Sequence, residues 1–333
     1  MTTRRARGTA LLVTALALVL AAGCSSDAGT ANATGVEKPD LTVAVVPIVD
    51  SAGFFIALDR GLFKAQGLNV TFVPAISSET VIAGQASGQY DITGGNYVSY
   101  IQAQQRHLAD LDIFAEGSVL QPGGVGIFTM PGSPVKTIRE LKGRTVAINA
   151  PRNVLYMLAA LVLAENGIPS SDVRFVVPKD GFPAIPAELR AGAFDAAVLP
   201  EPFASITEQA DGAVPLADLY QGAATSFPGV GYVVTKQWAH KYPRTLAAFY
   251  RALEEGQEIA DTNRPAVEAA MEELPKPLGL PKITAAMMSL QSYPVSTGPA
   301  GSVDKVRLQR VADAMHQFIG FPAFSIDSML MGG

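Results

Sequence analysis

Residues 143–167 read GRTVAINAPRNVLYMLAALVLAENG, a stretch that predicts a short buried strand turning directly into a helix. Thr145–Ile148 is β-branched and apolar and has the length of a buried strand. Pro151 suits the first turn of a helix, because its missing N–H group would be unpaired there anyway. From Val154 onward apolar residues share one helical stripe, and Asn166-Gly167 supplies a left-handed stop.

The turn between this strand and helix is predicted to form half of a ligand pocket. A strand that turns sharply into a helix directs free backbone N–H groups at whatever lies beyond the end of the strand. The residues of the turn that we expect at a ligand are Asn149, Arg152, Asn153 and Val154. Arg152 could pair with a carboxylate, sulfonate or phosphate, and the alternative is an arginine solvated on the helix surface.

Strands and helices alternate on both sides of this unit, which predicts mostly parallel sheets with helices on both faces. Strands are expected at residues 41–46, 70–73, 90–93, 111–115, 173–177 and 196–199. Helices are expected at residues 54–60, 80–88, 98–105, 186–191, from 238 or 242 to 263, and at 265–273, 283–290 and 303–319.

Two similar Gly-flanked runs, GVGIFT at residues 124–129 and GVGYVV at 229–234, suggest two matching strands of a hinge between two lobes. The segment between them has its own strands and helices. We therefore expect lobe 1 at 41–127, lobe 2 at 128–228, and a return to lobe 1 with C-terminal helices at 229–333.

Residues 1–23 have the pattern of a signal peptide. Three arginines precede an apolar run at 10–22 that is too short to span a membrane comfortably. LAAGC at 20–24 resembles the lipobox of bacterial lipoproteins, which implies a diacylglyceryl group on Cys24; the alternative is an ordinary thiol. Residues 24–40 then form a lipidated, flexible tether. We expect general secretion rather than twin-arginine export, because the apolar residues expected just after Arg4-Arg5 are missing.

Composition excludes several classes of protein. Hydrophobic residues make up 48% of the chain and charged residues 17%, which argues against a disordered or polyanion-binding protein. No Lys/Arg cluster outside the leader suggests a nucleic-acid partner. Cys24 is the single cysteine, so the exported body has no disulfide and no thiol nucleophile. His107, His240 and His316 lack the spacing of metal ligands, and we expect neither a metal nor a cofactor.

Four blocks of the sequence resemble the solute-binding proteins of ABC importers, specifically the nitrate/sulfonate/taurine and thiamine-precursor group. They are ALDRGLFKAQGLNV at 57–70, SGQYDITG at 87–94, LKGRTVAIN at 141–149 and RAGAFDAAVLPEP at 190–202, in the order of that family. The chain departs from the family at Arg152, where relatives often carry a small hydroxyl residue. Asp50 and Glu201 also add acids that a pure anion site would avoid.

The resemblance implies a type II periplasmic-binding-protein fold, with two α/β lobes, a two-strand hinge and a ligand clamped between the lobes. It implies a non-enzymatic protein that binds a small polar organic solute, of the sulfonate/taurine/nitrate or thiamine-pyrimidine-precursor type, and delivers it to a membrane permease. With the lipobox, it implies a monomer anchored by lipid to the outer face of the cell membrane. The alternatives are an enzyme on the same fold and a sensor or adhesion lipoprotein.

The cleft of such sheets lies at the carboxyl ends of the strands. Besides the turn at 149–154, this rule selects Asp50, Ser51, Gly94, Gly95, Asn96, Tyr97, Glu201 and Phe227 as candidate ligand-binding residues. Asp50 could instead be a turn residue, Glu201 a structural loop acid, and Gly94-Gly95 an ordinary tight turn. Four further aromatics could stack on a flat ligand, although such residues are more often core: Phe54, Phe55, Phe182 and Phe203.

Overall fold

The strand and the helix at 143–167 form where the sequence predicts them, but Pro151 lies in the turn before the N-cap Asn153 and not in the first turn of the helix. Thr145–Ala147 forms strand β6, Val154–Glu165 forms helix α5, and Gly167 has a left-handed backbone with a φ of 75°. The computed structural model describes residues 35–119, 122–274 and 303–331. The signal peptide, Cys24, most of the tether and the helix predicted at 283–290 lie outside these residues.

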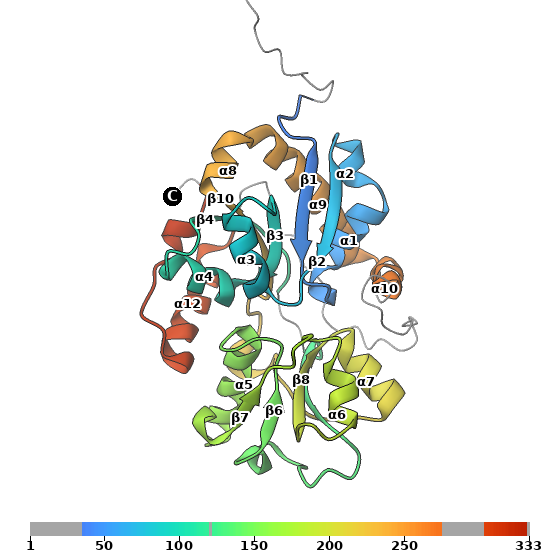
Figure 1. Cartoon of the computed structure of the whole chain (residues 1–333), viewed down its shortest axis with the longest axis vertical. Coiled ribbons are helices and arrows are strands. Elements are labelled where there is room, and N and C mark those ends of the chain that lie inside the picture. Colours follow the sequence, from blue (N-terminus) through green and yellow to red (C-terminus); the bar gives the residue numbers. More distant parts are fainter. Residues whose placement is uncertain (1–34, 120–121, 275–302, 332–333) are drawn as a thin grey trace, which may run out of the picture. The chain divides into compact units, whose positions relative to one another are not determined.

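The described strands form two sheets of five strands each (Figure 1). The first has the order β2-β1-β3-β10-β4, made by β1 (Asp40–Val45), β2 (Asn69–Pro74), β3 (Ile92–Asn96), β4 (Leu111–Glu116) and β10 (Val230–Thr235). The second has the order β7-β6-β8-β5-β9, made by β5 (Val125–Thr129), β6, β7 (Arg174–Val176), β8 (Ala196–Pro200) and β9 (Val214–Asp218).

Both sheets are mixed rather than mostly parallel: each has two parallel and two antiparallel pairings, because one strand in the equivalent place runs against the other four. β10 runs antiparallel to β3 and β4, and β5 runs antiparallel to β8 and β9. The remaining pairings, β1 with β2 and β3, and β6 with β7 and β8, are parallel. The predicted α/β fold of two lobes is therefore confirmed.

Helices cover the sheets in the alternating manner that the sequence predicts (Figure 1). Those of the second lobe are α5, α6 (Ile185–Arg190) and α7 (Phe203–Asp211). Those that accompany the first sheet are α1 (Ala52–Asp59), α2 (Leu62–Ala65), α3 (Ser78–Ala86), α4 (Tyr97–Gln105), α8 (Lys236–Lys241), α9 (Pro243–Thr262), α10 (Arg264–Glu273) and α12 (Lys305–Ile319). Short 3-10 turns occur at Val49–Ser51, Ile138–Leu141, Ser170–Asp172, Gly222–Ala224 and Ile326–Met329.

The core of the first lobe is aromatic and depends on a close approach of α1 and α9. The rings of Phe63 and Phe249 stack with centroids 4.6 Å apart, and the Phe54 ring lies 5.5 Å from Phe63. Phe54 is therefore a core residue, the alternative that the sequence left open. Gly53 on α1 and Gly256 on α9 face each other, and a Cβ atom on Gly256 would lie 2.8 Å from Ala57 Cβ and collide with the Gly53 carbonyl oxygen.

The chain crosses between the sheets twice, but the crossings are not the two Gly-flanked runs. They follow β4 and β9, and they pair with each other: Gly117 N–H donates to Val230 O (2.8 Å) and Gly229 N–H to Ser118 O (3.0 Å). The run at 124–129 lies inside the second sheet as β5, and the run at 229–234 inside the first as β10. They resemble each other because each is the antiparallel strand with a neighbour on both sides.

This placement moves the expected lobe boundary. Residues 125–127 pair with β8 and β9, although the sequence assigned them to lobe 1. We infer lobe limits that follow the sheets, with the second lobe running from β5 to β9 and the first lobe made of the segments before and after it.

Candidate functional site

One cavity lies where strand ends of the two sheets meet, as the carboxyl-end rule requires. Its volume is about 40 Å³, which holds the centres of roughly three water molecules. Its lining comes from both lobes and from the return crossing: Val46, Ile48, Asp50, Ser78, Gly95, Asn96, Val125, Asn149, Asn153, Val154, Leu155, Phe182, Pro200, Tyr220, Gly229 and Val230. Among the described residues of this lining there is no lysine or arginine.

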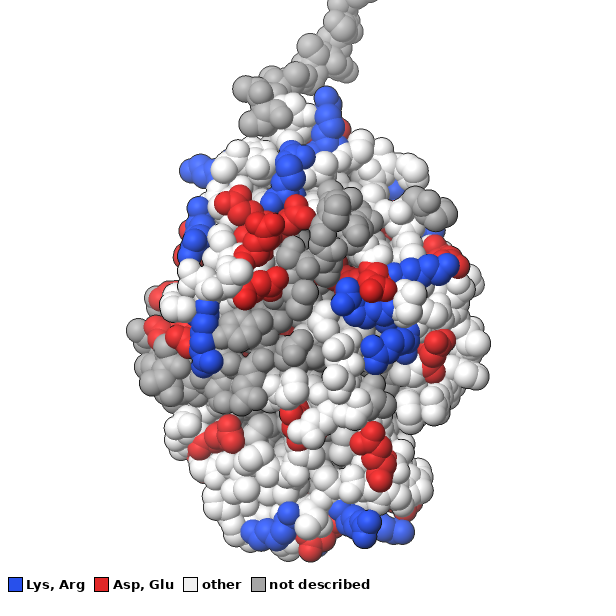
Figure 2. Space-filling view, turned by 180° about the vertical axis from the view of Figure 1, so that it is seen from behind, with Lys and Arg blue, Asp and Glu red and all other residues white. Residues whose placement is uncertain are grey.

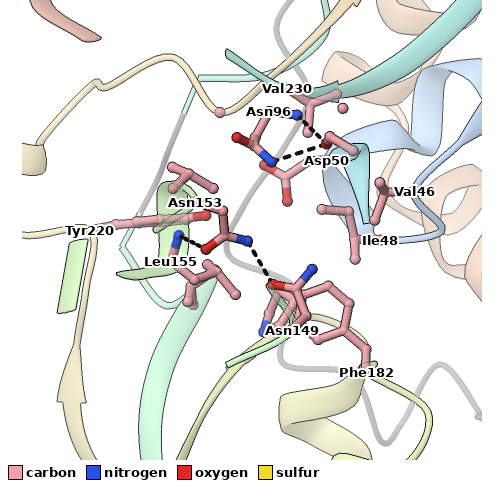
Figure 3. A pocket seen from close by; sticks show the side chains of 16 residues that line it. Val46, Ile48, Asp50, Asn96, Asn149, Asn153, Leu155, Phe182, Tyr220 and Val230 are labelled. Atoms are coloured by element: carbon pink, nitrogen blue, oxygen red, sulfur yellow. Dashed lines mark hydrogen bonds between the residues drawn. The ribbon is translucent and has the colours of Figure 1, made fainter. Parts of the chain in front are cut away.

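The structure brings one part of the predicted set to the cavity. Asp50, Gly95, Asn96, Asn149, Asn153 and Val154 line it, and Figure 3 shows Asp50 and Asn96 on one side and Asn149, Asn153 and Phe182 on the other. Ser78, Tyr220 and Val125 are lining residues that the sequence did not indicate. Of the four aromatics proposed to stack on a ligand, Phe182 reaches the lining, where its ring stacks on Phe203 at 5.3 Å.

The other part of the predicted set lies elsewhere. Ser51, Gly94, Tyr97, Arg152, Glu201 and Phe227 are outside the lining. Gly94 makes room for the Tyr232 ring, which would lie 2.7 Å from a Cβ atom there, and Tyr97 is buried with its hydroxyl against Gly231. Phe227 is buried beneath Arg310, whose guanidinium lies 5.6 Å from the ring centroid.

Asp50 is the acidic side chain among the described residues of the lining. Its side chain is 2% exposed, and its Oδ1 accepts a hydrogen bond of 2.8 Å from the Ser118 hydroxyl on the first crossing. Among the described residues, none donates to its Oδ2, which is also buried. Burial raises the pKa of Asp50, and the Ser118 hydrogen bond opposes this shift only in part.

Two of the helices that begin at the cavity, α4 and α5, have some of their N-terminal N–H groups capped by their own asparagines, whereas Ser77, the N-cap of α3, makes no side-chain cap hydrogen bond. Asn96 Oδ1 accepts from Ser99 N (2.9 Å) at the start of α4. Asn153 Oδ1 accepts from Leu155 N (3.1 Å) and Tyr156 N (3.2 Å) at the start of α5. The expectation of free N–H groups after β6 is therefore wrong for Leu155 and Tyr156, because an N-cap side chain occupies them.

Replacing Asn153 with alanine is expected to lower the free energy of unfolding by about 2 kcal/mol. The substitution removes the α5 cap and also the donor to Asn149 Oδ1, which lies 2.9 Å from Asn153 Nδ2. Urea unfolding monitored by circular dichroism measures the loss. Asn69→Ala, at an exposed asparagine on β2, is the control; equal stability of the two variants would contradict the capping role.

Arg152 points away from the cavity, toward the C-terminal segment. Its backbone is left-handed, with a φ of 52°. The guanidinium donates to Ile319 O at the end of α12 and lies 5.4 Å from the Phe321 ring centroid. Its carbonyl oxygen accepts from Gln102 Nε2 of α4 at 2.6 Å. Arg152 thus joins the second lobe to α4 and α12, and the predicted ion pair with a ligand has no support in this geometry.

Glu201 is a buried helix cap beside the cavity. Its carboxylate accepts from Ser205 Oγ (2.9 Å) and Ser205 N (3.2 Å) on α7, while its carbonyl oxygen accepts from Val49 N of the first lobe (3.1 Å). The side chain is 2% exposed. Burial raises the pKa of Glu201 to about 7.

Comparison with known proteins agrees with this architecture. The family model described as "NMT1/THI5 like" matches residues 48–266, more than half of the chain. The chain belongs to the NMT1/THI5-like family. In this member of that family the matched residues include every described lining residue of the cavity except Val46. Among curated proteins, none matches the sequence.

Solved structures show that this NMT1/THI5-like chain has the periplasmic-binding-protein fold. The alkanesulfonate-binding protein SsuA from Xanthomonas axonopodis pv. citri, bound to MOPS, is 18% identical with a TM-score of 0.71 over 88% of this chain and 98% of its own. The periplasmic nitrate-binding protein NrtA from Synechocystis PCC 6803 is 16% identical, with a TM-score of 0.70 over 88% and 85%. A ligand-binding component of an ABC-type import system from Staphylococcus aureus is 13% identical, with a TM-score of 0.73 over 88% and 96%.

The described residues offer neither a metal site nor a membrane-spanning helix. No group of His, Cys, Asp and Glu side chains within residues 35–119, 122–274 and 303–331 could hold a metal ion. In the same residues, none of the helices has the length and apolar character needed to cross a membrane.

Proposed function

We propose that the chain is an extracytoplasmic solute-binding lipoprotein of an ABC importer. It holds a small polar organic solute in the cavity between its lobes and delivers it to a membrane permease. The observation that supports this most is the cavity itself, which is lined from both sheets and from the return crossing, so that closing of the lobes and binding of a solute are coupled.

The lining favours binding over catalysis. Asp50 and Tyr220 are the titratable side chains among its described residues, and no histidine, cysteine or lysine among those residues could act with them. The structural neighbours that bind alkanesulfonate and nitrate support the same reading, although at their identities they support the fold and not a particular solute. The lipobox at residues 20–24 supports a lipid anchor on Cys24 at the outer face of the membrane, and the chain acts there as a monomer.

Equilibrium dialysis against an isotope-labelled metabolite extract tests this function. A binding protein concentrates one solute at a stoichiometry close to one per chain and returns it chemically unchanged on denaturation. A solute that comes back altered would favour the alternative, an enzyme on the same fold.

Replacing Arg152 with alanine is expected to weaken solute binding about fivefold while the melting temperature barely moves. The side chain joins the second lobe to Ile319 and Phe321, contacts worth about 1 kcal/mol to the closed arrangement. Titration calorimetry measures the affinity, and small-angle X-ray scattering of the solute-free protein should show a larger radius of gyration. Arg139→Ala, at an exposed arginine, is the control; identical scattering and affinity in both variants would show that the contact does not hold the lobes together.

A further inference from the structure

The cavity presents an acceptor where an anion-binding site would present donors. Asp50 Oδ2 is buried, lies in the lining and receives no hydrogen bond from the described residues. An unpartnered buried carboxylate oxygen is costly, so a donor from the solute would stabilise it. Burial and the nearby Asp50 charge raise the pKa values of the Tyr220 and Tyr232 hydroxyls, and neither of these groups is a cation.

Several N–H groups at the helix N-termini near the cavity are already occupied, although α3, which begins at Ser78, has no side-chain cap. A helix N-terminus binds an anion through its free N–H groups. Here Asn96 caps α4, Asn153 caps α5, and the Glu201 carboxylate accepts from Ser205 N near the start of α7. A sulfonate or nitrate at this place would face the Asp50 carboxylate, and among the described lining residues there is no arginine or lysine to compensate.

The rest of the lining suits a compact, partly apolar body. Phe182, held by its stack on Phe203, and the side chains of Ile48 and Leu155 provide apolar wall (Figure 3). Asn149 accepts from Asn153 through Oδ1, and within the described part of the chain its Nδ2 group donates to no other residue, so it can donate to the solute.

Resting on the proposed function, we infer that the solute is a small nitrogen base, a basic amine or an amino-substituted heterocycle, whose N–H group donates to Asp50. The chain then differs in solute class from the structural neighbours that bind alkanesulfonate and nitrate.

The test uses the full-length protein in detergent and a labelled whole-cell metabolite extract divided by ion exchange. A cation exchanger loaded near pH 3 retains nitrogen bases, an anion exchanger retains sulfonates and other strong acids, and the flow-through holds neutral solutes. Each fraction is dialysed against the protein, and the retained solute is identified by mass spectrometry. We expect it in the cation-retained fraction.

The variant Asp50→Asn tests the contact directly. Asparagine can still accept from Ser118 through Oδ1, but it places an N–H₂ group where Oδ2 stood, so the donor–acceptor pattern is reversed without loss of volume. We expect the retained nitrogen base to bind about 100-fold more weakly. Asp112→Asn, at a buried carboxylate on β4 outside the lining, is the matched control and should bind as the unsubstituted protein does.

The outcomes separate the inference from the proposed function. Retention of a solute from the anion-retained or neutral fraction overturns the inference and leaves the receptor function standing. An affinity for the nitrogen base that Asp50→Asn does not lower also overturns it. Retention of nothing from any fraction overturns the proposed function, and the inference with it. If Asp50→Asn does not fold, the class of solute retained by the unsubstituted protein decides alone.

Discussion

Replacing Gly256 with alanine should destabilise the protein by about 3 kcal/mol, although alanine is the better helix former by about 1 kcal/mol. The reason is the contact with α1: the added methyl group would collide with the Gly53 carbonyl oxygen and lie 2.8 Å from Ala57 Cβ. A backbone oxygen cannot rotate away as a side chain can, so the two helices must separate. Urea unfolding measures the change.

The control for this prediction lies next to it on the same helix. Glu255→Ala, at an exposed position of α9, changes helix propensity by a few tenths of a kcal/mol and should leave stability nearly unchanged. A Gly256→Ala variant as stable as this control would mean that α1 and α9 adjust freely. Because α1 follows directly on Asp50 and Ser51, the displaced helix should also weaken solute binding.

Stability should fall by about 3 kcal/mol as the pH rises from about 4.5 to 7, through the titration of Glu201 alone. The pKa of Glu201 is about 7 in the folded protein, and the ordinary value of 4.5 applies to the unfolded chain. Between these values the folded state binds more protons than the unfolded state, so raising the pH favours unfolding, and the effect is complete above pH 7. Unfolding free energies at pH 5 and pH 8 measure the fall.

Glu201→Gln separates this term from the other buried acids. Asp50 and Glu116 also have raised pKa values and contribute a slope of the same sign, whereas Glu37, lowered to about 2, acts at more acidic pH. Glutamine does not titrate, so the difference in stability between pH 5 and pH 8 should shrink by about 3 kcal/mol in the variant. If the unsubstituted protein and the Glu201→Gln variant have the same pH dependence, the other buried acids and not Glu201 cause it.

The sequence predicts the cavity better than it predicts the directions of side chains. Asp50, Asn96 and Asn149 follow strands, and the ends of parallel strands meet at one edge whatever the tertiary detail. Arg152 belongs to the same turn but points to α12, because its left-handed backbone and the Phe321 ring decide its direction. Neither feature has a local sequence signal.

The sequence does not predict the elements whose contacts lie far away along the chain. Tyr220 reaches the cavity from the return crossing, and β9 is an edge strand that begins with Val214-Pro215 and alternates too weakly to be recognised. The break between α8 and α9 had a signal, since the residue before Pro243 is disfavoured in a helix. Of the two starts expected for the helix that ends at 263, the one at 242 is therefore confirmed, and residues 236–241 form the separate helix α8.

The two sheets become complete at different moments of synthesis. All five strands of the second sheet lie in one uninterrupted segment, from Val125 to Asp218. The first sheet lacks its β10 strand until residues 230–235 have been made, and until then β3 and β4 each have an unsatisfied edge. The second lobe, although it follows the first strands of the first lobe along the chain, can therefore be the first to form its native strand pairing. During translocation the strands β1 to β4 cannot complete their sheet until β10 has emerged.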